Sequence, residues 1–187
     1  KDMLAYLCVI HNPGDDLRLG RIINTPARGI GAVTIDTARA IAQRTGQSLW
    51  QVISNPVPYP DLAKAAPRLA QFADMIAALR ALEGKLSLPD LYEEVMARTG
   101  YVKALEAKND TESRTRVENV RELLTSINSY LENNPDRPNL AGFLDEIALY
   151  TDIDAHDPSE DCVVMMTMHA AKGLEFPVVF VVGAEEG

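Results

Sequence analysis

Apolar residues recur at helical spacing along most of this 187-residue chain. The segments 67–83 and 111–132 show the pattern most clearly, with Leu69, Phe72 and Ile76 on one face of the first. An apolar stripe with a period near 3.6 residues is typical of a helix that buries one face. Several such segments, separated by Pro and Gly, predict a mainly α fold that resembles a helical bundle.

The composition changes near the C-terminus. Residues 151–161 are rich in acids and contain neither Lys nor Arg, whereas the residues from Cys162 onward are mainly apolar and β-branched. Short apolar runs of this kind have the length of buried strands. We therefore predict a helical domain at residues 1–161, with an acidic hinge at 151–161, and a segment at 162–187 that contributes a short C-terminal β segment of two strands to a larger core.

Neither the acidic hinge nor the cysteines have the spacing of a metal site. The acids around His156 lack the regular oxygen-ligand spacing of a calcium loop. Cys8 and Cys162 form no C-x-x-C motif and no cluster with His. We expect no metal site and no disulfide framework. No apolar run approaches the roughly 20 residues that span a bilayer, so we expect no membrane contact.

The formal net charge of -9 argues against a protein that coats nucleic acid, because phosphate binding relies on Lys and Arg. The distribution of charge qualifies this argument. Between residues 18 and 44 there are five arginines and one acid. Such a stretch is compatible with a local basic surface on an acidic body, where binding is weak and salt-sensitive.

A turn with two glycines separates two predicted helices near the N-terminus. The first helix ends before Pro26, the second spans about 34–44, and Gly29, Ile30 and Gly31 lie between them. Glycines free the backbone so that several N–H groups can converge on one anion at the start of the following helix. This arrangement favours phosphate binding, and the alternative is that the glycines serve only a tight connection.

A polar loop near the C-terminus lies between the two apolar runs of the predicted β segment. It carries His169, Lys172, Gly173 and Glu175. A loop held between buried strands presents side chains and amides to a ligand with little freedom to lose. The alternative for His169 is a turn histidine that bonds only to the backbone.

The same loop, which reads Thr-x-His-x-Ala-Lys-Gly-Leu-Glu at residues 167–175, resembles motif V of the UvrD/PcrA/Rep superfamily 1 DNA helicases. The resemblance extends to three blocks, at residues 1–7, 12–16 and 21–31, which occur in this order where the 2B subdomain of that family begins. These blocks and motif V bracket nearly the whole chain. The chain therefore resembles a fragment that covers the 2B subdomain and the start of motor subdomain 2A.

The resemblance implies roles for particular residues. Thr167 and His169 match positions that contact the backbone of single-stranded DNA. Glu175 and Gly173 match the nucleotide side of the motif, where a carboxylate accepts a hydrogen bond from the ribose of ATP. The turn near the N-terminus looks like the duplex contact of the 2B subdomain, and the residues implied there are Arg28, as a phosphate ligand, with Gly29, Ile30, Gly31 and Thr34.

The resemblance also implies a parent protein: an ATP-dependent 3′ to 5′ DNA helicase of repair or replication, with ATP and Mg²⁺ as cofactors. In that parent this piece would contact the duplex backbone and regulate unwinding, while motif V couples single-stranded DNA to ATP. The expected partners are a junction of single-stranded and duplex DNA, the remaining helicase subdomains, and repair or transcription proteins. The expected location is the bacterial cytoplasm, in association with the nucleoid.

Two catalytic elements of such a motor are absent from the sequence. It contains no G-x-x-x-x-G-K-[ST] phosphate loop, and its Asp145-Glu146 pair falls in a predicted helix and not after an apolar strand. We therefore expect this chain alone to bind no cofactor and to hydrolyse no ATP. The alternative function is a protein-interaction or autoinhibitory helical module without DNA affinity, favoured by the net charge and the many helical faces.

Overall fold

The computed structural model describes residues 1–154, 165–166, 171 and 175–182, with the side chains of residues 149–154 excepted. The chain divides into two compact units, Lys1–Leu144 and Asp145–Gly187, and each is described here by itself.

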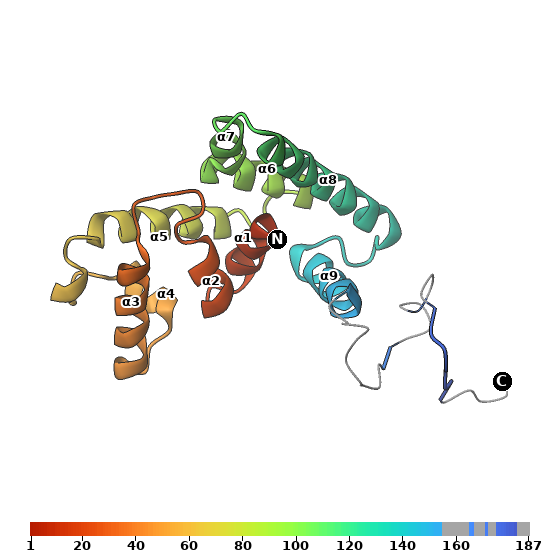
Figure 1. Cartoon of the computed structure of the whole chain (residues 1–187), viewed down its shortest axis with the longest axis horizontal. Helices are drawn as coiled ribbons and strands as arrows, with labels where there is room; N and C mark the ends of the chain where they lie inside the picture. The colour runs from red at the N-terminus through yellow and green to blue at the C-terminus, as the bar shows by residue number, and fades with distance from the viewer. Residues whose placement is uncertain (155–164, 167–170, 172–174, 183–187) are drawn as a thin grey trace. The chain divides into compact units, whose positions relative to one another are not determined.

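The described residues form nine α-helices and one short 3₁₀ helix (Figure 1). The predicted mainly α fold is confirmed. The two C-terminal strands are not confirmed, because the described residues 165–166 and 175–182 include no strand. The helices are α1 (Asp2–His11), α2 (Asp16–Ile22), α3 (Ala32–Thr45), α4 (Leu49–Ser54), η1 (Pro60–Leu62), α5 (Ala66–Arg80), α6 (Leu88–Thr99), α7 (Tyr101–Glu106), α8 (Thr111–Asn133) and α9 (Leu140–Asp154).

Helix α1 is the centre of the first unit. It packs against α2, α5 and α6, and Figure 1 shows α3 and α4 on one side of it and the group of α6, α7 and α8 on the other. A helix that is apolar on most of its circumference is stable only when neighbours cover it on several sides. This explains why six of the ten residues of α1 are buried: Met3, Ala5, Tyr6, Leu7, Val9 and Ile10.

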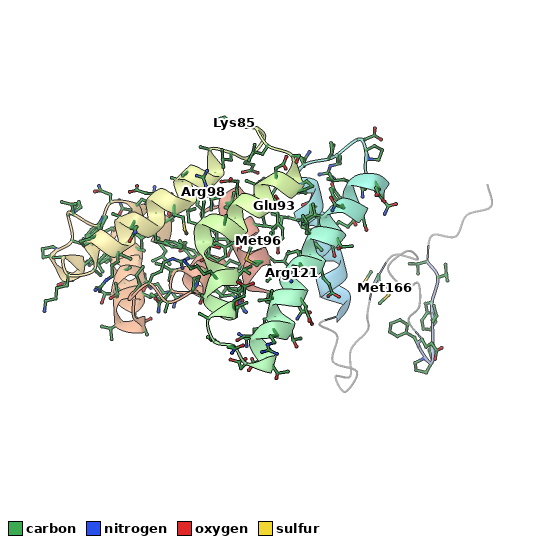
Figure 2. All side chains as sticks on the ribbon, turned by 90° about the horizontal axis from the view of Figure 1, so that it is seen from above. Lys85, Glu93, Met96, Arg98, Arg121 and Met166 are labelled. Atoms are coloured by element: carbon green, nitrogen blue, oxygen red, sulfur yellow. The ribbon has the colours of Figure 1, made fainter. Side chains whose placement is uncertain are left out.

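Helices α6, α7 and α8 form a smaller group within the same unit. The Tyr92 hydroxyl on α6 donates a hydrogen bond of 2.8 Å to the carbonyl of Val120 on α8. Glu93 and Arg98, two charged residues of α6 that are labelled in Figure 2, are exposed. Leu91 and Val95, on the apolar face of the same helix, are buried.

The last described helix, α9, begins directly after Asn139. The Asn139 side chain accepts a hydrogen bond of 2.9 Å from the amide of Gly142, as an N-cap residue does. The helix continues to Asp154, so the first four residues of the predicted hinge are helical. The remaining hinge residues, 155–161, lie outside the described part, and the domain boundary at residue 161 stays a prediction.

Candidate nucleic-acid interface

The glycine turn, defined as residues 29–31, connects α2 to α3 and is fixed at its centre. Ile30 between the two glycines is fully buried. The side-chain oxygen of Asn24 accepts hydrogen bonds from the amides of Arg28 and Ile30, at 2.7 and 3.2 Å. A side chain that accepts from two nearby amides replaces the bonds that a regular helix would supply. The turn is therefore an ordered loop on a buried anchor.

The two glycines of the turn differ in backbone conformation and in the space around them. Gly29 has φ of +69°, a left-handed conformation that side chains disfavour. Gly31 has φ of -74° and ψ of 167°, which any residue adopts. A Cβ added at Gly31 meets no atom within 4 Å. Neither the backbone nor the described neighbours require a glycine at position 31, whereas the backbone requires one at position 29.

The first turn of α3 is open to an anion. Gly31 is the N-cap residue and has no side chain to accept from the first amides, and the first turn contains no acidic residue. Ala32 is exposed, Val33 is 80% exposed and Thr34 is half-buried. The first amides of a helix carry partial positive charge and have no partner within the helix. A phosphate oxygen could accept from them without displacing another side chain.

The guanidinium of Arg28 points into the unit. It donates hydrogen bonds to the Tyr6 hydroxyl and to the carbonyls of Ile22, Pro26 and Thr99, at 2.7 to 3.2 Å. The sequence predicts Arg28 as a phosphate ligand, and the structure does not bring its donors to the surface of the turn.

The sequence reading missed Arg68. This exposed side chain on α5 donates to the carbonyl of Gly29 at 3.3 Å, and its atoms lie 3.2 to 3.4 Å from where a Cβ of Gly29 would be. It thus places an exposed cation beside the turn. Arg68 is an exposed residue of α5 outside its apolar stripe. No pattern in the sequence indicates that this side of the helix contacts a turn 39 residues away.

Acidic side chains pair with three of the five arginines between residues 18 and 44. Arg18 pairs with Asp15 at 2.5 Å, Arg21 with Asp2 at 2.6 Å, and Arg39 with Asp36 at 3.8 Å. Arg21 and the Tyr101 hydroxyl both donate to Asp2. Burial alone raises the pKa of Asp2, but these two hydrogen bonds outweigh it and hold the pKa below its ordinary value. Arg68 is an exposed cation that the structure places directly against the turn.

Most of the motif V residues lie outside the described part of the chain. This holds for Thr167, His169 and Gly173. Glu175 is described and exposed. The roles assigned to these four residues stay predictions.

Among the described residues, no group of three or more His, Cys, Asp or Glu side chains is arranged to hold a metal ion. Their helices also include none with the length and apolarity needed to cross a membrane.

Comparison with known proteins covers the whole chain. Residues 1–187 match the family model of the UvrD-like helicase C-terminal domain. The chain is similar to the ATP-dependent DNA helicase PcrA of Bacillus subtilis, with 40% identity. It is also similar to the PcrA helicases of Staphylococcus aureus and Leuconostoc citreum, each with 37% identity. Every alignment covers 100% of this chain and 26% of the relative, so the chain spans about a quarter of the length of these proteins.

Proposed function

Because this chain belongs to the UvrD-like helicase family, we propose that it is the part of an ATP-dependent 3′ to 5′ DNA helicase that contacts the duplex and regulates its unwinding. The glycine turn and the first turn of α3 form the contact. They bind the phosphate backbone and read the shape of the duplex, since backbone amides carry no base-specific information.

The observation that carries the proposal is Gly31. Its backbone angles and its empty surroundings give no reason within the described chain for a glycine. A phosphate that approaches the amides of Ala32 and Val33 gives such a reason, because a Cβ at position 31 would stand beside the approaching oxygens. The uncapped first turn supports the same reading.

Arg68 supplies the cation of this contact. Its side chain is exposed and lies against Gly29, so a phosphate at the turn stands within reach of both the guanidinium and the first amides of α3. Charge-assisted hydrogen bonds from Arg to phosphate are stronger than neutral ones. Thr34 adds a neutral hydroxyl in the same turn.

Motif V provides the second contact of the proposed helicase. Thr167 and His169 bind the backbone of single-stranded DNA, and Gly173 and Glu175 lie on the nucleotide side. A loop that meets DNA at one end and ATP at the other couples nucleotide state to grip on the strand. The complete helicase binds ATP with Mg²⁺, works with its other subdomains, and meets repair or transcription proteins.

A binding titration of Gly31→Ala tests the proposal. Fluorescence anisotropy with a duplex that carries a single-stranded tail should show affinity about tenfold weaker than wild type, the loss expected for one charge-assisted contact. The unfolding free energy should stay unchanged, because Ala fits the backbone at position 31.

Gly84→Ala is the matched control. Gly84 has φ of +75° and lies beyond the C-terminal end of α5. Arg68 lies in the first turn of the same helix, at the opposite end. This variant should lose stability and keep its affinity. Equal affinity of Gly31→Ala and wild type would refute the proposed contact.

A second candidate is a protein-interaction or autoinhibitory module. Two apolar side chains favour it: Leu17 is 82% exposed and Val57 is 84% exposed. Apolar side chains that are this exposed can mark a surface for another protein when they are contiguous. This candidate predicts no salt-sensitive duplex binding by the wild-type chain, so the same titration separates the two functions.

A further inference from the structure

We infer that Arg28 is a positioning residue, which holds the glycine turn in its DNA-binding geometry from inside the unit and does not itself contact phosphate. The inference rests on the proposed function of the turn, and it assigns to Arg28 a role different from the one that the sequence suggests.

The hydrogen bonds of Arg28 account for nearly all of its donors. A guanidinium has five N–H groups. Both terminal nitrogens of Arg28 donate twice: one to the carbonyls of Ile22 and Pro26, the other to the Tyr6 hydroxyl and the carbonyl of Thr99. Only the Nε–H group has no acceptor among the described residues. A phosphate contact through the terminal nitrogens would have to break these bonds.

Aromatic rings complete the site around the guanidinium. Its central carbon lies 5.8 Å from the ring centre of Tyr6 and 5.3 Å from that of Phe72, and both rings are buried. A planar cation over an aromatic face gains electrostatic attraction, which increases where water is excluded. The side chain of Arg28 therefore has one well-defined position.

This position determines where the turn lies. Two of the four hydrogen bonds join the segment before the turn to α1 through Tyr6 and to the end of α6 through Thr99. The amide of Arg28 binds Asn24, the residue that also holds the amide of Ile30. The side chain and the main chain of Arg28 thus fix the turn from both sides, immediately before Gly29.

Lysine cannot replace arginine here. An ammonium group has three donors in a compact head and no planar face. Arg28→Lys keeps the charge but leaves at least one of the four internal acceptors without a donor. A variant that keeps the charge therefore separates positioning from phosphate attraction.

The test compares Arg28→Lys and Tyr6→Phe with Arg68→Ala in the full chain. Tyr6 is fully buried and cannot touch DNA, yet its hydroxyl accepts from Arg28 and donates to the carbonyl of Thr25 at 2.5 Å. Both positioning variants should weaken duplex binding about tenfold and leave the slope of log affinity against log salt unchanged. Arg68→Ala should reduce that slope by about 0.9, the value for one lost phosphate contact.

Amide hydrogen exchange gives a second readout that a general loss of stability would not reproduce. In Arg28→Lys and Tyr6→Phe, the amide of Ile30, which donates to Asn24, should exchange at least fivefold faster, while those in the middle of α8 should not change. The double variant should lose little more than either single one, because both changes break one network.

Two results would overturn the inference. One is unchanged exchange in the turn in both variants, whatever the DNA titration gives. The other is near-normal affinity of Arg28→Lys together with a slope reduced by about 0.9 in Arg28→Ala, which is the behaviour of a direct phosphate ligand. Failure of the proposed function gives a different result: wild type and Gly31→Ala then bind duplex equally or not at all, while the turn still loosens in the Arg28 variants.

Discussion

Gly29 and Gly31 lie two positions apart, and only Gly29 has a backbone conformation that requires glycine. Gly29→Ala should lower the unfolding free energy by about 1 to 2 kcal/mol, the cost of a side chain in the left-handed region. The neighbouring Arg68 is exposed and can move away, so crowding adds little. Gly31→Ala should stay within about 0.5 kcal/mol of wild type. Urea unfolding of both variants measures the difference, and equal losses would contradict it.

For single residues, the sequence predicts where the turn lies in the chain better than it predicts where a side chain points. The spacing of Pro26, Gly29 and Gly31 locates the turn, since these residues restrict the backbone locally. The inward direction of Arg28 could not be predicted. Its acceptors on Tyr6 and Thr99 are 22 and 71 residues away, and only the folded chain brings them to one point. The same holds for Arg68 beside Gly29.

The N-terminal end of α6 allows a test of how much one helix cap contributes to stability. The Ser87 hydroxyl oxygen, at the N-cap of α6, accepts from the amide of Asp90 at 3.3 Å. Ser87→Ala should lower the unfolding free energy by about 1 kcal/mol, the usual cost of losing an N-cap. The control is Ser126→Ala on the exposed face of α8, which should change it by less than about 0.5 kcal/mol. Thermal unfolding compares the two, and a larger loss in the control would contradict the assignment.

The apolar stripes at 67–83 and 111–132 predict α5 and α8 correctly, although α5 ends at Arg80, before the predicted residue 83. Ser87 and Asp90 form only half of a capping box, because Asp90 accepts from the Ser87 hydroxyl and not from its amide. The shorter side chain of Asp reaches back less far than that of Glu. The full box occurs at α4, between Ser48 and Gln51. Helix α3 begins two residues before the predicted 34, because Gly31 is its N-cap.

Buried tyrosines connect the helices across the whole unit, and they predict its response to alkaline pH. Burial raises the pKa of Tyr6 to about 12 and that of Tyr101 to about 12, and it raises the pKa of Tyr92 further. Unfolded tyrosines titrate near 10. Between pH 10 and 12 the unfolded chain therefore binds fewer protons than the folded chain. The unfolding free energy should fall with rising pH, by up to about 1.4 kcal/mol per pH unit for each tyrosine.

Urea unfolding at several pH values, with tyrosinate absorbance recorded in parallel, measures this fall. Below pH 9 the tyrosine contribution should be constant, since neither state has lost the proton. Tyr6→Phe should show a shallower decline because one titrating group is gone. Ionisation of all tyrosines near pH 10 in the folded chain would contradict the expectation.

The central place of α1 has a consequence for synthesis on the ribosome. Its partners α5 and α6 come later in the chain, and the carbonyl of Thr99, at the end of α6, completes the hydrogen bonds of Arg28. At synthesis rates of about 5 to 20 residues per second, Thr99 follows α1 by roughly 5 to 20 s. During that interval the nascent chain presents an apolar helix that α2 covers but α5 and α6 do not yet cover, and a chaperone that binds apolar nascent segments could shield it.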